Sequence, residues 1–386
     1  MATGPGPAGG ATDLRVSVCR DPRAFAALAP DWTRLHRACG PATPFQSHAW
    51  LHSWWLSYGV PRRLRLALVW RGPELVAAAP LMRVLRPYPV LVPIGGAITD
   101  YADVLIDGRA DTGGEVTAAL ARAVRRAARG AVVDLREVRA GAAAERLYAV
   151  WRGPKRRLAD SVCLELPGLP MDGLIARVGS SRGQRIRSTL RKLDAAGVTE
   201  RDVPAAEVAS AVGEMLRLHL LQWRGRGVNP EHARARFAEH LGRAAALMTA
   251  AGEAVVTEFR RAGEVVAVNL TVLSPGLAGG YLYGADPDLR RAKVDVNTLL
   301  MRHGVRQAAG GGRATLSLLR GAEPYKSHWR PSAAANQRFL LSGGPAAPLL
   351  LLRHAAARTR AAAAAHPRLR TFHAHLTGRR PPRPTG

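Results

Sequence analysis

The chain has 386 residues, which is long enough for two domains of ordinary size. Hydrophobic residues make up 47% of it and charged residues 22%, as in common globular proteins. Its formal net charge of +27 predicts a positive field that attracts polyanions such as CoA, nucleotides, tRNA or anionic lipid, without choosing among them.

The cysteines and the apolar segments indicate the compartment of the protein and its relation to membranes. Cys19, Cys39 and Cys163 lie too far apart for a disulfide framework or a cysteine metal site, so we expect a reducing compartment and no metal. The N-terminal MATGPGPAGGATD lacks the basic stretch and apolar core of a signal peptide. The most apolar run, Pro345–Leu352, is too short to span a bilayer. We therefore expect a soluble, cytoplasmic protein whose contact with anionic lipid, if any, is peripheral.

The predicted elements alternate between strands and helices, which indicates an α/β protein. Ser47 is a candidate N-cap for one of the helices. In the first part of the chain we expect a disordered lead at 1–12, a strand at 14–19, helices at 22–38 and 46–58, and a strand at 131–135 that closes the first sheet. In the second part we expect a strand at 160–166, helices at 180–196, 204–224 and 231–251, a strand at 337–341 and an Ala-rich helix from about 346.

The layout of the chain repeats after about 180–190 residues. Segments 64–85 and 254–274 both read as a strand, a glycine turn, a glutamate and a second strand. Segments 121–138 and 301–321 both read as a basic helix, a glycine break and an apolar strand. The repeat predicts an internal duplication, although unrelated units of this kind would look alike. The predicted regions are a disordered N-terminus at 1–12, an N-terminal lobe at 13–166, a C-terminal lobe at 170–343 and a basic, Ala-rich helical tail with a disordered end at 344–386.

Polar residues in three places are candidates for contact with a substrate. Asp100 and Tyr101 are an acidic and a phenolic group that suit a cationic or hydroxylated acceptor, although a purely structural role is an equal alternative. Arg182 and Arg185 share a helix face that suits phosphate, carboxylate or tRNA, although a solvated basic helix has the same pattern. Trp223 follows His219 by four residues, so both lie on one face of a predicted helix.

His219 is also a candidate general base, because the ordinary pKa of histidine lies near neutrality. A packed, hydrogen-bonded histidine is the commoner alternative at such a position.

Residues 279–331 contain the most informative pattern. An aromatic strand at 281–283 runs into the turn Gly284-Ala285-Asp286-Pro287, then a basic loop, a helix, and an apolar strand at 314–319. A basic loop at a helix N-terminus predicts a site for a phosphorylated ligand, since free N–H groups and the helix dipole favour anions there. The basic residues of this loop are Arg290, Arg291 and Lys293, although a solvated basic helix start would have the same pattern.

The segment Arg320-Gly321-Ala322-Glu323-Pro324-Tyr325-Lys326 follows that last strand. Gly321 permits a sharp turn and Pro324 suits a first helical turn. Glu323 and Lys326 are three residues apart and so are able to pair.

The order of these motifs, from Tyr281 through GADPDLRR to RGAEPYK, resembles the C-terminal half of the CelD-like GNAT acetyltransferases (BioF2-like domains), which are relatives of the FemABX aminoacyl transferases. The resemblance runs from about Arg15 to Phe339. It implies an α/β fold of two tandem GNAT-like lobes (the acyl-CoA N-acyltransferase fold), each a twisted mixed sheet flanked by helices. It also implies acyl transfer from a CoA thioester.

The resemblance assigns roles to individual residues. The GNAT pyrophosphate loop, Arg/Gln-x-x-Gly-x-Gly/Ala, is matched at Arg291, whereas Val294 and Val296 occupy the glycine positions. Relatives often carry Asp where this chain has Ser317, which implies a different acceptor or base here. The resulting candidates are Tyr325 (proton donor to the thiolate), Glu323 and His219 for catalysis; Tyr283, Arg290, Arg291, Lys293, Val294, Asp295 and Lys326 for the cofactor; and Asp100, Tyr101, Arg182, Arg185 and Trp223 for the substrate.

The function expected from the sequence is transfer of an acetyl or other acyl group from acyl-CoA to an amine or hydroxyl acceptor in a cleft between the lobes. The acceptor is a small molecule, a saccharide or a peptide, acyl-CoA acts as cosubstrate, and we expect no tightly bound cofactor. Two alternatives stay open: a Fem-like aminoacyl transfer from tRNA, and a non-catalytic protein that binds polyanions through its basic tail.

Overall fold

The computed structural model describes residues 14–365, apart from 86, 226–228 and 322. The predicted disordered lead and the end of the predicted tail therefore lie outside the described residues. Within them, thirteen strands form one mixed sheet with helices packed against it, which confirms the predicted α/β class. No helix in the described ranges is long and apolar enough to cross a membrane.

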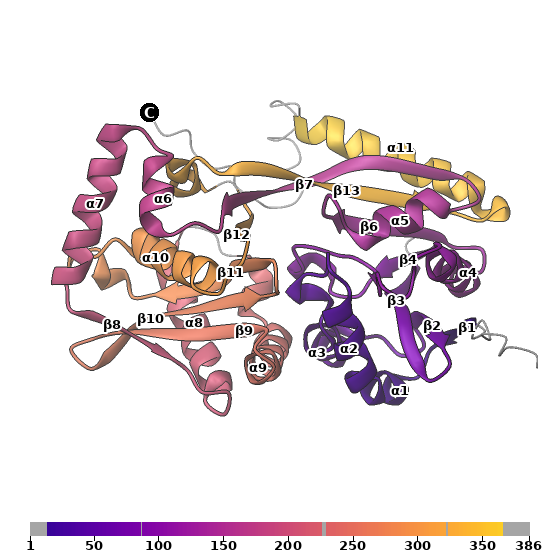
Figure 1. Cartoon of the computed structure of the whole chain (residues 1–386), viewed down its shortest axis with the longest axis horizontal. Helices are drawn as coiled ribbons and strands as arrows, with labels where there is room; N and C mark the ends of the chain where they lie inside the picture. The colour runs from indigo at the N-terminus through magenta and orange to yellow at the C-terminus, as the bar shows by residue number, and fades with distance from the viewer. Residues whose placement is uncertain (1–13, 86, 226–228, 322, 366–386) are drawn as a thin grey trace, which may run out of the picture.

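The first half of the chain forms the indigo and purple part of Figure 1. Its strands β1 to β4 are antiparallel neighbours in sequence order, and β6 then pairs with β4 in parallel. The strands are β1 (Leu14–Cys19), β2 (Leu64–Arg71), β3 (Glu74–Leu85), β4 (Pro89–Pro93), β5 (Leu105–Ile106) and β6 (Val132–Val138), and the helices are α1 (Pro22–Ala27), α2 (Ala29–Ala38), α3 (His48–Tyr58), α4 (Glu115–Ala128) and α5 (Ala143–Val150).

The second half repeats this topology. Strands β8 to β11 are antiparallel neighbours, and β12 pairs with β11 in parallel. The strands are β7 (Lys155–Pro167), β8 (Val198–Asp202), β9 (Ala254–Arg261), β10 (Glu264–Leu273), β11 (Leu277–Ala285), β12 (Thr315–Arg320) and β13 (Ser332–Leu341). The helices are α6 (Met171–Ala176), α7 (Ser180–Ala195), α8 (Val208–Gln222), α9 (Ala235–Ala250), α10 (Val296–Ala309) and α11 (Ala347–Ala365), with short 3-10 helices at η3 (Pro230–Ala233) and η5 (Pro324–Trp329).

Two long strands, β7 and β13, join the halves into one sheet (Figure 1). β13 pairs with β6 of the first half on one side and with β7 along its other side. β7 also pairs with β12 of the second half. The prediction that residues 131–135 close the first sheet is therefore wrong, because β6 lies between β4 and β13.

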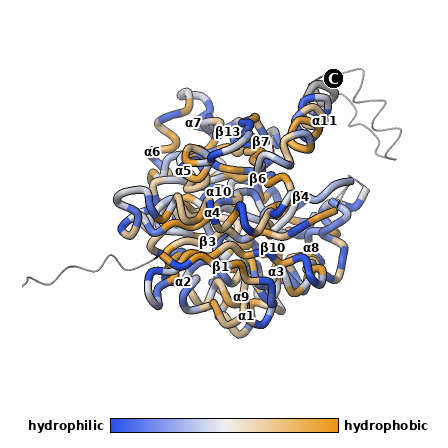
Figure 2. The backbone as a smooth tube through the Cα atoms, turned by 90° about the vertical axis from the view of Figure 1, so that its right-hand side faces the viewer, coloured by the Kyte–Doolittle hydropathy of each residue, from blue (hydrophilic) through white to orange (hydrophobic). Residues whose placement is uncertain are grey.

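Local signals explain several of the elements. The Ser47 hydroxyl accepts the N–H of Trp50 at 3.2 Å, which confirms Ser47 as the N-cap of α3. The helix predicted at 22–38 is instead two helices separated at Leu28, because Pro30 has no N–H with which to continue the first one. Figure 2 shows the hydrophobic segments concentrated along the central strands, with α11 at the edge of the molecule.

Aromatic side chains seal the contact between the halves. Tyr281 of β11 lies 5.1 Å from Trp50 and 5.9 Å from Phe45, measured between ring centroids. Its hydroxyl donates to the carbonyl of Ile98 at 2.8 Å. Helix α9 of the second half also packs along α3 of the first. Because these contacts are buried, they hold the two halves in one arrangement around the site described next.

Candidate active site

Two neighbouring strands of the second half separate near the middle of the sheet. β11 and β12 pair only where residues 277–279 meet residues 315–317. β11 then continues along β10 to Ala285, whereas β12 pairs with β7 on its other side. Leu319 has a φ of 55° and Gly321 a φ of 109°, and these left-handed conformations redirect the chain. The separation leaves a slot of about 60 Å³ between the strands, closed behind by Met301 and Gly304 of α10.

Two larger hollows adjoin this slot. The first, of about 480 Å³, lies at the N-terminus of α10 and is called the α10 hollow; the second, of about 300 Å³, includes residues of both halves and is called the central hollow. Tyr283 and Tyr325 line the slot and both hollows, and Trp223 and Glu323 line both hollows. Four residues predicted from sequence thus meet at one junction.

Close packing of α8 on β11 positions His219. A Cβ added at Gly284 would lie 2.0 Å from the Met215 carbonyl oxygen and 2.6 Å from the His219 nitrogen, so only glycine lets the helix approach this closely. At this separation His219 Nδ1 lies 2.8 Å from the Tyr283 carbonyl oxygen. One turn further along α8, the Gln222 amide donates to the Tyr283 hydroxyl at 3.1 Å.

His219 also contacts a second histidine that sequence reasoning missed. Its Nε2 lies 3.1 Å from Nδ1 of His232, which comes from η3. Both residues line the central hollow. Burial lowers the pKa of His219 below its ordinary value, and burial together with the nearby His219 lowers the pKa of His232 to about 4. Both rings are therefore neutral near pH 7.

The turn at η5 presents Tyr325 to the junction. Burial, with Glu323 nearby, raises the pKa of Tyr325, so its hydroxyl keeps its proton at neutral pH. The Lys326 ammonium is buried and donates to the carbonyls of Arg320 at 3.1 Å and Gly321 at 3.2 Å, with Glu323 at 2.7 Å. Lys326, predicted as a phosphate contact, thus holds the turn in place while lining the central hollow.

The predicted phosphate loop is largely bonded to itself. The N–H groups of Ala292, Lys293 and Val294 donate to carbonyls within the loop at 2.9–3.1 Å. The Asp295 carboxylate caps α10 by accepting the Thr298 N–H at 2.7 Å, which puts a negative charge at the helix N-terminus.

The three basic side chains of this loop lie in different surroundings. Arg290 lines the α10 hollow, as do Val294 and Asp295. Arg291 is exposed and pairs with Asp288 at 2.8 Å, and Lys293 is exposed. Neither of these two lines one of the hollows described here.

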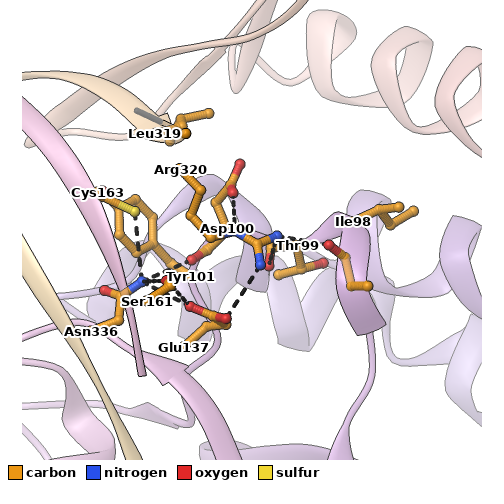
Figure 3. Close-up of polar contacts among 12 residues, drawn as sticks. Ile98, Thr99, Asp100, Tyr101, Glu137, Ser161, Cys163, Leu319, Arg320 and Asn336 are labelled. Carbon is orange, nitrogen blue, oxygen red and sulfur yellow. Dashed lines mark hydrogen bonds and ion pairs between the residues drawn. The ribbon is translucent and has the colours of Figure 1, made fainter. Parts of the chain in front are cut away.

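Arg320 joins the two halves beside the central hollow (Figure 3). It donates to the carboxylates of Asp100 and Glu137 and, through Nη2, to the carbonyls of Ala97 at 2.7 Å and Thr99 at 3.0 Å. Asp100, predicted to meet the acceptor, lines the central hollow, and its charge is balanced by Arg320.

Tyr101, the other predicted acceptor contact, is buried behind this joint. Its hydroxyl donates to Glu165 at 3.0 Å and lies 2.8 Å from Ser317 Oγ, which is also buried. Ser317 lines the slot. The position at which relatives carry Asp therefore contacts the first half of this chain through Tyr101.

Arg182 and Arg185 lie elsewhere. They belong to α7, which packs against α10 and stands at the far left in Figure 1. Arg185 is exposed and Arg182 is half-buried, and neither lines the hollows described above.

Sequence reasoning also missed Asn297, Gln222 and Asn229, which line the hollows. Gln222 follows His219 by three residues on α8, a spacing that would have indicated it. His232 and Asn229 reach the site through the return of the chain at η3, which has no local signal. In the described part of the chain, no group of three or more His, Cys, Asp or Glu side chains is arranged to hold a metal ion.

Comparison with known proteins agrees with the fold. Residues 180–327 match the sequence model of the acetyltransferase (GNAT) domain family. No curated protein sequence matches the chain.

Solved structures share the fold over most of the chain. FemX is 11% identical with a TM-score of 0.60, and the match covers 84% of this chain and 98% of FemX. A conserved protein of unknown function from Bacteroides thetaiotaomicron is 11% identical with a TM-score of 0.55, covering 85% and 100%. L-PGS from Bacillus licheniformis is 12% identical with a TM-score of 0.51, covering 86% and 96%. Residues 180–327 thus carry an acetyltransferase (GNAT) domain, and most of the chain shares its fold with FemX.

Proposed function

We propose that the protein transfers an acyl group from acyl-CoA to an amine or hydroxyl acceptor by direct attack on the thioester. The observation that carries this proposal is the position of Tyr325, which lines the slot, the α10 hollow and the central hollow. A pantetheine arm lying in the slot brings its thioester beside the Tyr325 hydroxyl. The acceptor then approaches from the central hollow, between the halves.

The reaction requires positioning, one proton donor and one proton acceptor. The acceptor nitrogen or oxygen forms a bond to the thioester carbonyl carbon, and the carbon–sulfur bond breaks. The departing thiolate takes the proton of Tyr325, whose raised pKa keeps that proton in place until the thiolate forms. The proton lost by the acceptor passes to a base on the side of the central hollow, where His219 and His232 lie.

The α10 hollow suits the phosphates of the donor only in part. Arg290 and the first turn of α10, including Asn297, line it and favour an anion. The Asp295 carboxylate opposes one. We therefore place the donor phosphates toward Arg290, with the adenosine outside the loop.

Calorimetric titration tests this proposal. The purified protein is titrated with acetyl-CoA and longer acyl-CoAs, at low and high salt, with ATP as an anion control. Saturable, salt-tolerant binding that discriminates between acyl chains supports the proposal and identifies the donor. Weak binding that matches ATP and disappears in high salt would eliminate acyl-CoA as the donor.

A second candidate is aminoacyl transfer from charged tRNA. Two features that disfavour CoA phosphates at the loop support this candidate: the loop amides are already bonded to loop carbonyls, and Asp295 lies at the helix N-terminus. The arginines of α7 support it as a basic surface for tRNA. The double variant Arg182→Ala/Arg185→Ala separates the two candidates. It should weaken tRNA binding and reduce its salt dependence, while leaving acyl-CoA titrations unchanged.

A further inference from the structure

We infer that His232 is the base that takes the acceptor's proton, and that His219 and the Tyr283 carbonyl hold it in the required tautomer. This inference rests on the proposed acyl transfer and adds a residue to it. The structural basis is a chain of two contacts, from the Tyr283 carbonyl to His219 and from His219 to His232.

The chain of contacts determines where each proton lies. A carbonyl oxygen only accepts hydrogen bonds, so His219 Nδ1 carries a proton and donates it to Tyr283 at 2.8 Å. Nε2 of a neutral His219 then carries a lone pair. The contact at 3.1 Å therefore requires His232 Nδ1 to donate. A neutral His232 is left with an unprotonated Nε2.

The surroundings of the pair keep both rings neutral. Glu231, next to His232 in the chain, is held by Arg236 at 2.7 and 2.9 Å and lies 3.5 Å from Arg234. Across the central hollow, the carboxylates of Asp100 and Glu323 are paired with Arg320 and Lys326. No carboxylate in this described set is left over to hold a proton on His232. Burial and the nearby His219 lower the pKa of His232 to about 4, and the opposing effect of Glu231 is smaller than theirs.

The ring of His232 is fixed in orientation. It stacks on the buried Phe237, with centroids 4.8 Å apart and planes at 20°. The η3 turn that carries it is capped by Asn229, whose side chain accepts the Glu231 N–H at 3.1 Å. His232 lines the central hollow and a further open hollow of about 400 Å³ that includes Ala97, Asp100 and Tyr281. With Nδ1 engaged and one face stacked, Nε2 is the ring's remaining polar atom.

The proton balance of the reaction then closes. When a neutral amine attacks the thioester, its nitrogen becomes positively charged and strongly acidic. Its proton moves to Nε2 of His232, and Tyr325 gives a proton to the thiolate. The resulting imidazolium keeps its Nδ1 donor bond to His219, and a proton returns to Tyr325 through solvent in the hollows. A weak base is sufficient, because the charged nitrogen gives up its proton readily.

The first test reads the protons directly in the free protein. Imidazole-¹⁵N-labelled protein is studied by long-range proton–nitrogen correlation at pH 7, with His354→Gln, on the remote helix α11, as an assignment control. We expect both His219 and His232 to be neutral with the proton on Nδ1. In His219→Phe, we expect the His232 signal to become a mixture of tautomers. A His232 protonated on Nε2 in the wild type would overturn the inference.

The second test reads the reaction. Release of CoA from acetyl-CoA is followed with tyramine, a small primary amine, as acceptor. His232→Gln should lower kcat by roughly 100-fold or more, with the KM for acetyl-CoA nearly unchanged, as for the loss of a general base. His354→Gln should match the wild type. An unchanged kcat in His232→Gln would refute the role of this residue. If the wild type releases no CoA, the proposed donor has failed, and the proton positions in the first test alone decide whether His232 is a free base.

Discussion

Replacing Gly284 with alanine tests how the site is built. The new Cβ would lie 2.0 Å from the Met215 carbonyl oxygen, whereas an ordinary carbon–oxygen contact is about 3.3 Å. Helix α8 must therefore move from β11 by about 1.3 Å, the difference between these two distances. The same shift stretches the His219–Tyr283 hydrogen bond from 2.8 Å beyond hydrogen-bonding range. Overpacking and the lost buried hydrogen bond together cost about 2–6 kcal/mol.

The assay is urea unfolding of Gly284→Ala beside Gly213→Ala. Gly213 lies on the exposed face of α8, where an added Cβ meets nothing within 4 Å. Alanine there should raise the free energy of unfolding by about 0.5–1 kcal/mol, because glycine disfavours a helix interior. The same substitution is thus expected to act with opposite sign at the two positions. If Gly284→Ala is as stable as the wild type, the close approach of α8 to β11 does not exist as described.

Three further predictions concern the proton donor, the pH dependence of folding and a buried ion pair. Tyr325→Phe should lower kcat by about 100-fold with acetyl-CoA affinity nearly intact, and an unchanged kcat would remove Tyr325 from the mechanism. Burial lowers the pKa of His240 from 6.5 to about 3, so the unfolded chain binds a proton that the folded chain does not. The free energy of unfolding contributed by this neutral ring is present above pH 6.5 and falls by about 2 kcal/mol at pH 5. In urea titrations, His240→Leu should lose this pH dependence, whereas His328→Leu should keep it. The carboxylate of Asp134 is fully buried and accepts hydrogen bonds from Arg338 at 2.7 and 2.6 Å. Asp134→Ala should therefore lower the free energy of unfolding by about 3–5 kcal/mol in the same titrations, and a loss below about 1 kcal/mol would contradict the importance of this ion pair.

Elements with strong local patterns were predictable from the sequence. The strand at 14–19 was predicted with its observed ends, and the cap of α3 followed from Ser47 alone. The repeated order of strand, turn, strand and helix anticipated the repeated topology of the two halves. These features depend on period and on capping chemistry, which act over a few residues.

Pairing between distant segments was not predictable in this way. β8 has the sequence VTERD, a short and polar edge strand with no hydrophobic alternation. The position of β13 between β6 and β7 depends on residues about 200 and 170 positions apart in the chain. No pattern within either strand specifies such a partner.

The candidate site likewise contains residues that the sequence predicts and residues that it does not. Tyr283, His219 and Trp223 each belong to a motif visible in the sequence, and they come together because α8 and its C-cap residue Trp223 pack on β11. Tyr101 satisfies the sequence pattern of an acceptor contact, but the structure buries it against Ser317. His232 contacts His219 only because the folded chain returns to the site at η3. A histidine in a polar turn gives no sign of that contact in the sequence.

The pairing of β13 with β6 has a consequence during synthesis. When β6 leaves the ribosome, its partner is still about 200 residues away in the chain. At about 5–20 residues per second, translation leaves that edge unpaired for roughly 10–40 s. An unpaired β edge recruits other strands, so the nascent first half is exposed to aggregation for that interval. Slow translation past residue 138 prolongs the exposure of this edge. A chaperone bound to the nascent chain shields the edge instead.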